Sequence, residues 1–173
     1  MIAGPPPTAA QPHARNPLTL FVGSSLAAKS QARAFITAQA TPQLRFLPWW
    51  EAFTAGRTLL EDLDAIRARV NGAILLLSPE SATTIRKHRV QIPNLNVLFE
   101  FGYFYGHFGE RRVAMLRYGE FYLPSDFGGY LHLNSSRSFR RGAALKIGKR
   151  TSREFERWIA QFPDAQTPIS AET

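Results

Sequence analysis

Cysteine is absent from the 173 residues of the chain. Disulfide bonds, thiolate metal sites and cysteine nucleophiles are therefore excluded. The four histidines lack the spacing of a metal site, and we predict no bound metal; they are His13, His88, His107 and His132.

Long apolar runs are also missing, and no stretch of the sequence is long and apolar enough to span a membrane. Residues 1–17 are rich in proline and alanine and lack the charged start and apolar block of a secretory signal. These features favour a cytoplasmic protein without membrane contact. We predict one domain over residues 18–163, between disordered tails at residues 1–17 and 164–173.

Acidic residues are scarce relative to basic ones. The chain has 13 Asp and Glu against 21 Lys and Arg, which gives a net charge of +8. Such a charge favours anionic partners, namely nucleic acid, phospholipid or a nucleotide, and does not choose among them.

The apolar residues fall in short runs separated by helical segments. Strands are predicted at residues 18–22, 44–47, 73–77, 113–116 and 130–133, and helices at residues 27–38, 58–70, 96–108 and 151–162. Thr151 and Glu154 are predicted to form a capping box for the last helix, and residues 49–56 and 81–93 are predicted to be loops. The continuous apolar runs at 18–22 and 73–77 indicate central strands of a parallel sheet. We therefore predict an α/β domain with a central parallel sheet of four to five strands flanked by helices, and a ligand at the carboxyl ends of the strands.

The helix predicted at residues 96–108 carries the carboxylate of greatest interest, Glu100. An apolar stripe on this helix is assigned to the core: Val97, Phe101, Phe104, Tyr105 and Phe108. Glu100 lies off the stripe, on the side of Asn96, Tyr103 and His107. A carboxylate among aromatic side chains is unfavourable unless it is used or paired. The alternative is an exposed helix glutamate.

Three glycines recur in the same segment at near-helical spacing: Gly102, Gly106 and Gly109. Glycine inside a helix is destabilising by about 1 kcal/mol relative to alanine. We therefore expect another backbone to approach this helix closely.

Five segments, in order along residues 18–133, resemble motifs of bacterial TIR-like nucleotide-binding domains. They are residues 21–25 (Phe-Val-Gly-Ser-Ser), 50–56 (Trp-x-x-Phe-x-x-Gly), 96–102 (Asn-Val-Leu-Phe-Glu-Phe-Gly), 106–112 and 123–129. The resemblance implies a flavodoxin-like TIR fold and an effector of bacterial anti-phage defence that hydrolyses NAD when assembled. It also implies self-association and a sensor of cyclic nucleotides, fused to the effector or separate from it. The family's arginine two positions before the asparagine of the helix motif is Asn94 here.

The resemblance assigns Glu100 as the catalytic carboxylate of an NAD glycohydrolase. Nicotinamide leaves NAD as a neutral group, so one carboxylate suffices to hold the ribose hydroxyls and stabilise the oxocarbenium-like charge. We predict substrate-binding roles for Ser24 and Ser25 with ribose or phosphate, for Trp50 and Phe53 in stacking, and for Asn96 and Tyr103 beside the carboxylate. NAD is the substrate, no separate cofactor is expected, and the product is linear or cyclic ADP-ribose. Glu100→Gln is expected to abolish cleavage and to change stability little.

Two other functions remain open at this point. One is a nucleoside deoxyribosyltransferase-like enzyme, which also uses a carboxylate at an N-glycosidic bond and which product analysis would distinguish. The other is a TIR-type interaction or nucleotide-binding module without catalysis, which the replacement of the family arginine by Asn94 keeps open. Strong salt-dependent affinity for DNA or RNA without NAD cleavage would favour the module.

Two basic runs stand outside these motifs. The first is residues 86–89, and the second extends from Arg137 to Arg153 without an acidic residue before Arg153. We interpret them as solvated surface, and the alternative is contact with phosphates of NAD or of a nucleic acid. No second domain large enough to sense a messenger is predicted, so we expect either a separate sensor of cyclic nucleotides or nucleic acid as a partner, or a chain that is a fragment.

Overall fold

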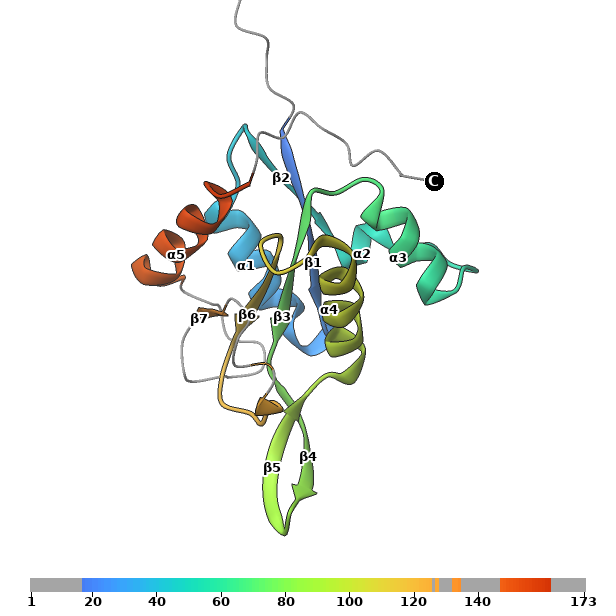
Figure 1. The fold of residues 1–173 in the computed structure, drawn as a ribbon, viewed down its shortest axis with the longest axis vertical. Coiled ribbons are helices and arrows are strands. Elements are labelled where there is room, and N and C mark those ends of the chain that lie inside the picture. Colours follow the sequence, from blue (N-terminus) through green and yellow to red (C-terminus); the bar gives the residue numbers. More distant parts are fainter. Residues whose placement is uncertain (1–16, 126, 128–131, 135–146, 163–173) are drawn as a thin grey trace, which may run out of the picture.

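The computed structural model describes residues 17–125, 127, 132–134 and 147–162. The predicted tails therefore lie outside the described residues, except for Pro17. A five-stranded sheet forms the centre of the domain (Figure 1). Its order is β2 (Leu44–Pro48), β1 (Leu18–Ser24), β3 (Gly72–Leu77), β6 (Val113–Arg117) and β7 (His132–Asn134).

Every pairing in this sheet is parallel. The α/β class and the parallel sheet of four to five strands are confirmed. β1 and β3 lie inside the sheet, as their continuous apolar runs indicated, since a strand buried on both faces has no solvated side on which to place polar residues.

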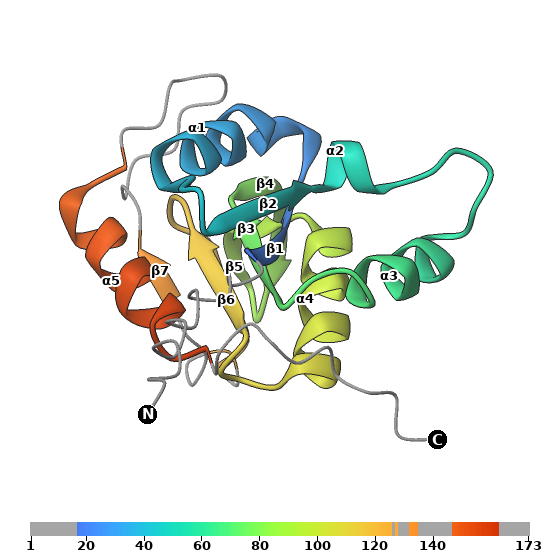
Figure 2. The same ribbon diagram turned by 90° about the horizontal axis from the view of Figure 1, so that it is seen from above.

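Helices cover the sheet on both faces (Figure 2). On one face, α1 (Lys29–Gln39) packs on β1 and α5 (Lys149–Ile159) packs on β7, and Phe35, Phe155 and Trp158 share one core with apolar residues of the sheet. On the other face, α3 (Leu59–Arg67) and α4 (Leu95–Phe108) bury their apolar sides against the sheet. Two short helices, η1 (Leu26–Ala28) and α2 (Trp49–Ala52), follow the carboxyl ends of β1 and β2. Among the described residues, no helix combines the length and the apolar character that crossing a membrane requires.

The segment predicted to be a loop at residues 81–93 is an antiparallel hairpin instead. β4 (Pro79–Ile85) pairs with β5 (His88–Pro93), and the hairpin projects from the end of β3 away from the helical layers (Figure 1). Arg86 and Lys87 form its turn with φ angles of 47° and 69°. The sequence does not indicate the hairpin, because this turn lacks the glycine or asparagine that usually marks a two-residue loop.

The capping box predicted at Thr151 and Glu154 is also wrong. α5 begins two residues earlier, with Gly148 as its N-cap, and Thr151 is buried within the first turn. A capping box does occur at α3, where Thr58 and Glu61 exchange backbone and side-chain hydrogen bonds. Both segments match the Ser/Thr-x-x-Glu pattern, so the pattern alone could not place the helix start.

Candidate functional site

Glu100 is buried in α4, with only 6% of its surface exposed. Its Oε2 atom has no hydrogen-bond partner within the described part of the chain. Glu100 was expected to lie off the apolar stripe assigned to the core, but the structure buries it together with Val97 and Phe101. The alternative of an exposed helix glutamate is wrong. A buried carboxylate oxygen without a donor is unfavourable, because desolvation is then not compensated.

Gly23, near the end of β1, makes room for this carboxylate. A Cβ atom at residue 23 would lie 2.8 Å from the Glu100 Oε2 atom and would also overlap the Leu75 side chain. Glycine is therefore the residue that lets Glu100 approach the strand. Gly23 was not among the predicted site residues, although a glycine inside an apolar strand is a known signal of close approach.

Burial is the cause of an unusual acidity at this position. Desolvation raises the pKa of Glu100 from its ordinary value to about 7. The side chain therefore exchanges its proton near neutral pH. A carboxylate that is poised in this way can stabilise a positive charge in its vicinity or accept hydrogen bonds from hydroxyl groups.

Ser24 and Trp49 join the ends of two neighbouring strands. The Trp49 indole N–H donates to the Ser24 Oγ atom over 2.9 Å, and that hydroxyl donates to the Ser25 carbonyl. Ser24 is buried, and Trp49 is the first residue of α2. Trp49 was not among the predicted site residues, although the predicted Trp50 stands next to it.

A family model for the TIR domain of CAP12/Pycsar effector proteins matches residues 19–137, which is more than half of the chain. The chain belongs to this family. The resemblance found in the motifs is thereby confirmed, and the carboxyl ends of β1 and β2 with the first half of α4 lie within the matched TIR domain.

Three relatives match parts of the TIR domain. Pycsar effector protein PaPycTIR of Pseudomonas aeruginosa is 34% identical over 88 residues, which cover 49% of this chain and 29% of the relative. CD-NTase-associated protein 12 of a Lachnospiraceae bacterium is 29% identical over 110 residues, or 64% of this chain and 35% of the relative. The uncharacterized protein YuaY of Escherichia coli is 38% identical over 79 residues, or 44% and 26% of the two chains. The chain thus spans well under half the length of these relatives.

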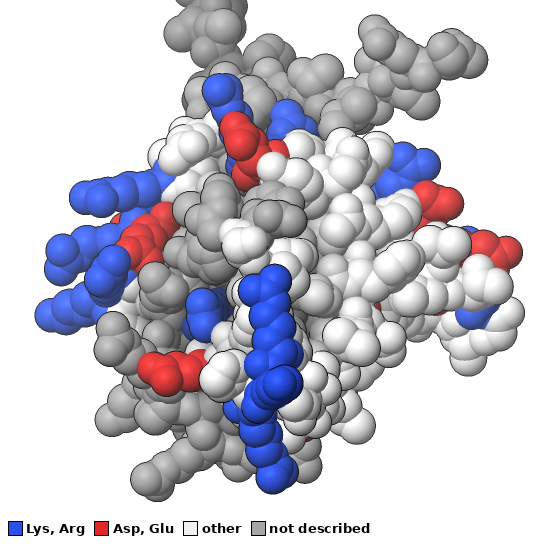
Figure 3. Space-filling view, turned by 60° about the horizontal axis from the view of Figure 1, so that its bottom comes forward, with Lys and Arg blue, Asp and Glu red and all other residues white. Residues whose placement is uncertain are grey.

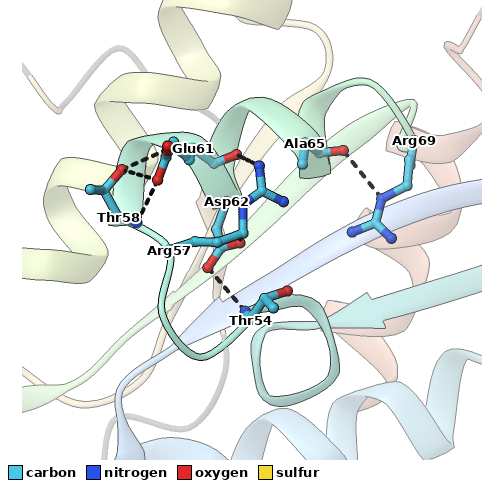
Figure 4. A network of polar contacts seen from close by, with 7 residues as sticks. All are labelled: Thr54, Arg57, Thr58, Glu61, Asp62, Ala65 and Arg69. Atoms are coloured by element: carbon cyan, nitrogen blue, oxygen red, sulfur yellow. Dashed lines mark hydrogen bonds and ion pairs between the residues drawn. The ribbon is translucent and has the colours of Figure 1, made fainter.

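The loop after α2 in this TIR domain is tied to α3 (Figure 4). The buried Asp62 carboxylate accepts the Thr54 backbone N–H over 3.0 Å, and its other oxygen lies 3.7 Å from Arg57. The Thr58 and Glu61 capping box holds the next residues. With Trp49 bonded to Ser24, the segment is anchored at both ends.

Phe53 lies on the same side of the sheet as Glu100. Its ring centroid is 6.3 Å from that of Phe21 and 6.5 Å from that of Trp49, and it packs against the core that α4 covers. Trp50 packs against the other core, beneath α1, where the Lys29 ammonium and the Arg33 guanidinium lie over its ring. The structure therefore separates the two predicted stacking residues, and Trp50 is placed with α1.

Tyr103 and Asn96 flank Glu100 in sequence and have different surroundings. The Tyr103 hydroxyl donates to Asp64 of α3, and burial together with this bond raises the pKa of Tyr103 to about 12. The hydroxyl is thus engaged by α3 in this structure. Asn96 is exposed in the first turn of α4. Its backbone N–H donates to the Oδ1 atom of Asn94, whose side chain caps the helix.

The α4 glycines do not mark a close approach. A Cβ atom at residue 102 or 106 would meet nothing within 4 Å, so the expectation of a neighbouring backbone is wrong. Gly109 ends the helix with a φ of 74°, a conformation that favours glycine.

The first basic run occupies the tip of the hairpin. Residues 86–89 are exposed there, and Figure 3 shows a column of Lys and Arg side chains, uninterrupted by acidic ones, over the hairpin end of the molecule. Of the second run, Lys149, Arg150 and Arg153 lie on α5, and residues 137–146 lie outside the described residues. Within the described part of the chain, no cluster of three His, Asp or Glu side chains could hold a metal ion.

Proposed function

We propose that the chain is an NAD glycohydrolase and serves as an effector in anti-phage defence, with Glu100 as its catalytic carboxylate. The observation that carries the proposal is the buried Glu100 carboxylate, placed beside Gly23 at the end of β1 in a TIR domain of an effector family. Its Oε2 atom lacks a hydrogen-bond partner within the described residues, so no hydrogen bond to that oxygen compensates its burial.

The proposed chemistry needs one carboxylate. The bond between the ribose anomeric carbon and the pyridinium nitrogen breaks, its electron pair stays on the nitrogen, and neutral nicotinamide leaves. Glu100 stabilises the oxocarbenium-like charge on the ribose and accepts hydrogen bonds from its hydroxyls. Water then adds to the anomeric carbon and releases one proton, which gives ADP-ribose.

The burial of Glu100 supports an enzyme that is active only after assembly. A substrate cannot reach a carboxylate with 6% exposure unless the covering segments move. Apolar side chains that favour self-association are exposed nearby in sequence, since Leu95 and Phe99 on α4 are 64% and 51% exposed. Contacts between copies could displace the cover.

The names of the relatives support a cyclic-nucleotide context. They describe a Pycsar effector and a CD-NTase-associated protein. We propose that this chain acts in the cytoplasm and responds to a sensor of cyclic nucleotides, which another segment or a separate protein supplies. NAD is then the substrate and no further cofactor takes part.

The test compares the unmutated chain with Glu100→Gln at a protein concentration that promotes assembly. Nicotinamide release should fall by about 100- to 1000-fold in the variant, because one preorganised electrostatic group is lost. Glu110→Gln, an exposed change of the same kind, is the matched control and should keep full activity. Equal turnover in Glu100→Gln would disprove the assignment. Deoxyribosyl transfer between nucleosides, without nicotinamide release from NAD, would favour the deoxyribosyltransferase reading.

A further inference from the structure

A cavity of about 740 Å³ opens between the start of α1 and the base of the hairpin. Its polar lining comes from three separate parts of the chain: Ser25 just after β1 with Lys29, Ser30 and Arg33 on α1, Glu80 at the start of β4, and Asn94 before α4. The volume is in the range of nucleotide-sized ligand sites. Glu100 does not line this cavity, so the role of the cavity requires a separate explanation.

Two cations stand on the α1 wall. Lys29 and Arg33 are four residues apart on one helix face, and both lie over the Trp50 ring, with distances of 5.1 Å and 5.3 Å to its centroid. Neither makes an ion pair within the described part of the chain. The indole therefore holds two positive charges in place without neutralising them, which suits a ligand with two negative charges.

The opposite wall carries an acceptor. The Asn94 side-chain amide donates to the Glu80 Oε2 atom over 3.1 Å, while the Glu80 Oε1 atom is buried without a hydrogen-bond partner among the described residues. A buried carboxylate oxygen of this kind requires a donor. The vicinal hydroxyls of a ribose supply such donors, whereas a phosphate would be repelled.

The end of β1 connects the cavity with the Glu100 site. Ser25 lines the cavity, and Gly23, two residues earlier, lies so near the Glu100 carboxylate that an added Cβ atom would be 2.8 Å from its Oε2 atom. A dinucleotide that crosses the end of this strand has one half on each side. The two cations, the Glu80 acceptor and the nearness of the cavity to Glu100 all fit a dinucleotide.

We infer that this cavity binds the ADP half of a dinucleotide, with the diphosphate on Lys29 and Arg33 and the adenosine ribose on Glu80. The inference rests on the proposed function, because it places the second half of the NAD substrate. Trp50 then acts as the support of the two cations. Free ADP offers the same chemistry, and it serves as the probe.

The test measures ADP binding by calorimetry to the full chain carrying Glu100→Gln. In that background, Lys29→Ala with Arg33→Ala should weaken ADP binding at least tenfold. Lys87→Ala with Arg89→Ala at the hairpin removes the same charge and should leave ADP binding unchanged. Circular dichroism verifies the fold of both variants, whose mutated side chains are half-buried or exposed. Equal weakening by both pairs, or no binding of ADP to the parent, would overturn the inference.

A second comparison isolates the ribose contact. Glu80→Gln should weaken ADP and should not further weaken 2′,3′-dideoxy-ADP, which lacks the donors. Equal weakening of both ligands would remove Glu80 from the site.

The two proposals fail separately. If the unmutated chain cleaves NAD, and the Lys29 and Arg33 changes leave the KM for NAD the same, the subsite is disproved and the NAD glycohydrolase assignment stands. ADP binding that depends on Lys29 and Arg33, in a chain that never cleaves NAD, would uphold a nucleotide site and disprove the enzyme.

Discussion

A carboxyl group with a pKa of about 7 binds its proton more tightly in the folded chain than in the unfolded chain, where its ordinary value is 4.5. Between these two values the folded state holds more protons, so the stability due to this group is present at low pH and is lost as the pH rises toward 7. The shift corresponds to an upper bound of about 3 kcal/mol. The burial of Glu100 therefore changes the earlier expectation that Glu100→Gln alters stability little.

We predict that Glu100→Gln raises the free energy of unfolding by about 1–3 kcal/mol at pH 8 and has little effect at pH 4, where both side chains are neutral. Urea unfolding at the two pH values measures this difference. Glu110→Gln provides the baseline for an exposed glutamate. A gain that is equal at both pH values would show that the Glu100 charge is not the cause.

The same acidity predicts the pH dependence of NAD cleavage. The proposed mechanism needs the carboxylate form, whose fraction in the free enzyme rises about tenfold between pH 6 and pH 8 for a pKa near 7. Initial rates at low NAD concentration, with assembly held constant, should rise accordingly. A flat profile over this interval would argue against a titrating Glu100 as the catalytic group.

At the scale of elements, the segment between α2 and α3 depends on one buried acid. The Asp62 bond to the Thr54 N–H is charge-assisted, and its loss is worth about 1.5–3 kcal/mol. We predict that Asp62→Ala speeds hydrogen exchange at Thr54 at least tenfold and raises the KM for NAD, while amides of β3 keep their protection.

Asp64→Ala is the control for this experiment, because Asp64 lies on the same helix and contacts Tyr103 instead of the loop. If Thr54 exchanged at the same rate in both variants, the loop would be anchored by something other than Asp62.

The sheet could be predicted from the sequence, because β3 is apolar throughout and β1 is apolar except for Thr19 and Ser24, a composition typical of strands covered on both faces. The hairpin could not, since its Arg86-Lys87 turn carries no hairpin signal and its residues alternate with little burial. The start of α5 was misplaced because tertiary packing buries Thr151 inside the helix, where it is unable to cap.

The candidate site was predictable only in part. Glu100 followed from a motif, but its burial depends on Gly23, which lies 77 positions away in the chain and only the fold brings close. Trp49 and Trp50 pack into the cores on opposite faces of the sheet because of the way β2 ends beside β1. Two identical neighbours in a sequence give no sign of this difference.

For the whole molecule, exposed apolar residues on α4 predict how copies associate. Phe99→Asp should prevent assembly and lower NAD cleavage at least tenfold at a given protein concentration, because it places a charge in the exposed apolar face with Leu95. Analytical ultracentrifugation and nicotinamide release measure the two effects.

Tyr122→Asp is the matched control, since Tyr122 is also an exposed aromatic residue, 41% exposed, and lies outside α4. Loss of assembly in both variants would indicate general solubility rather than a contact through α4. An unchanged melting temperature in Phe99→Asp shows that the fold is retained.

The hairpin turn offers an opportunity for engineering. Arg86 and Lys87 adopt left-handed backbone conformations that are unfavourable for such residues by about 1 kcal/mol each. Replacing them by Asn-Gly should slow amide exchange along β4 and β5, because the turn directly joins these two paired strands. NAD cleavage should be unchanged, because residues 86 and 87 do not line the cavity. The native turn is thus less rigid but carries two projecting cations. A variant without these two charges would be a more rigid scaffold for crystallisation.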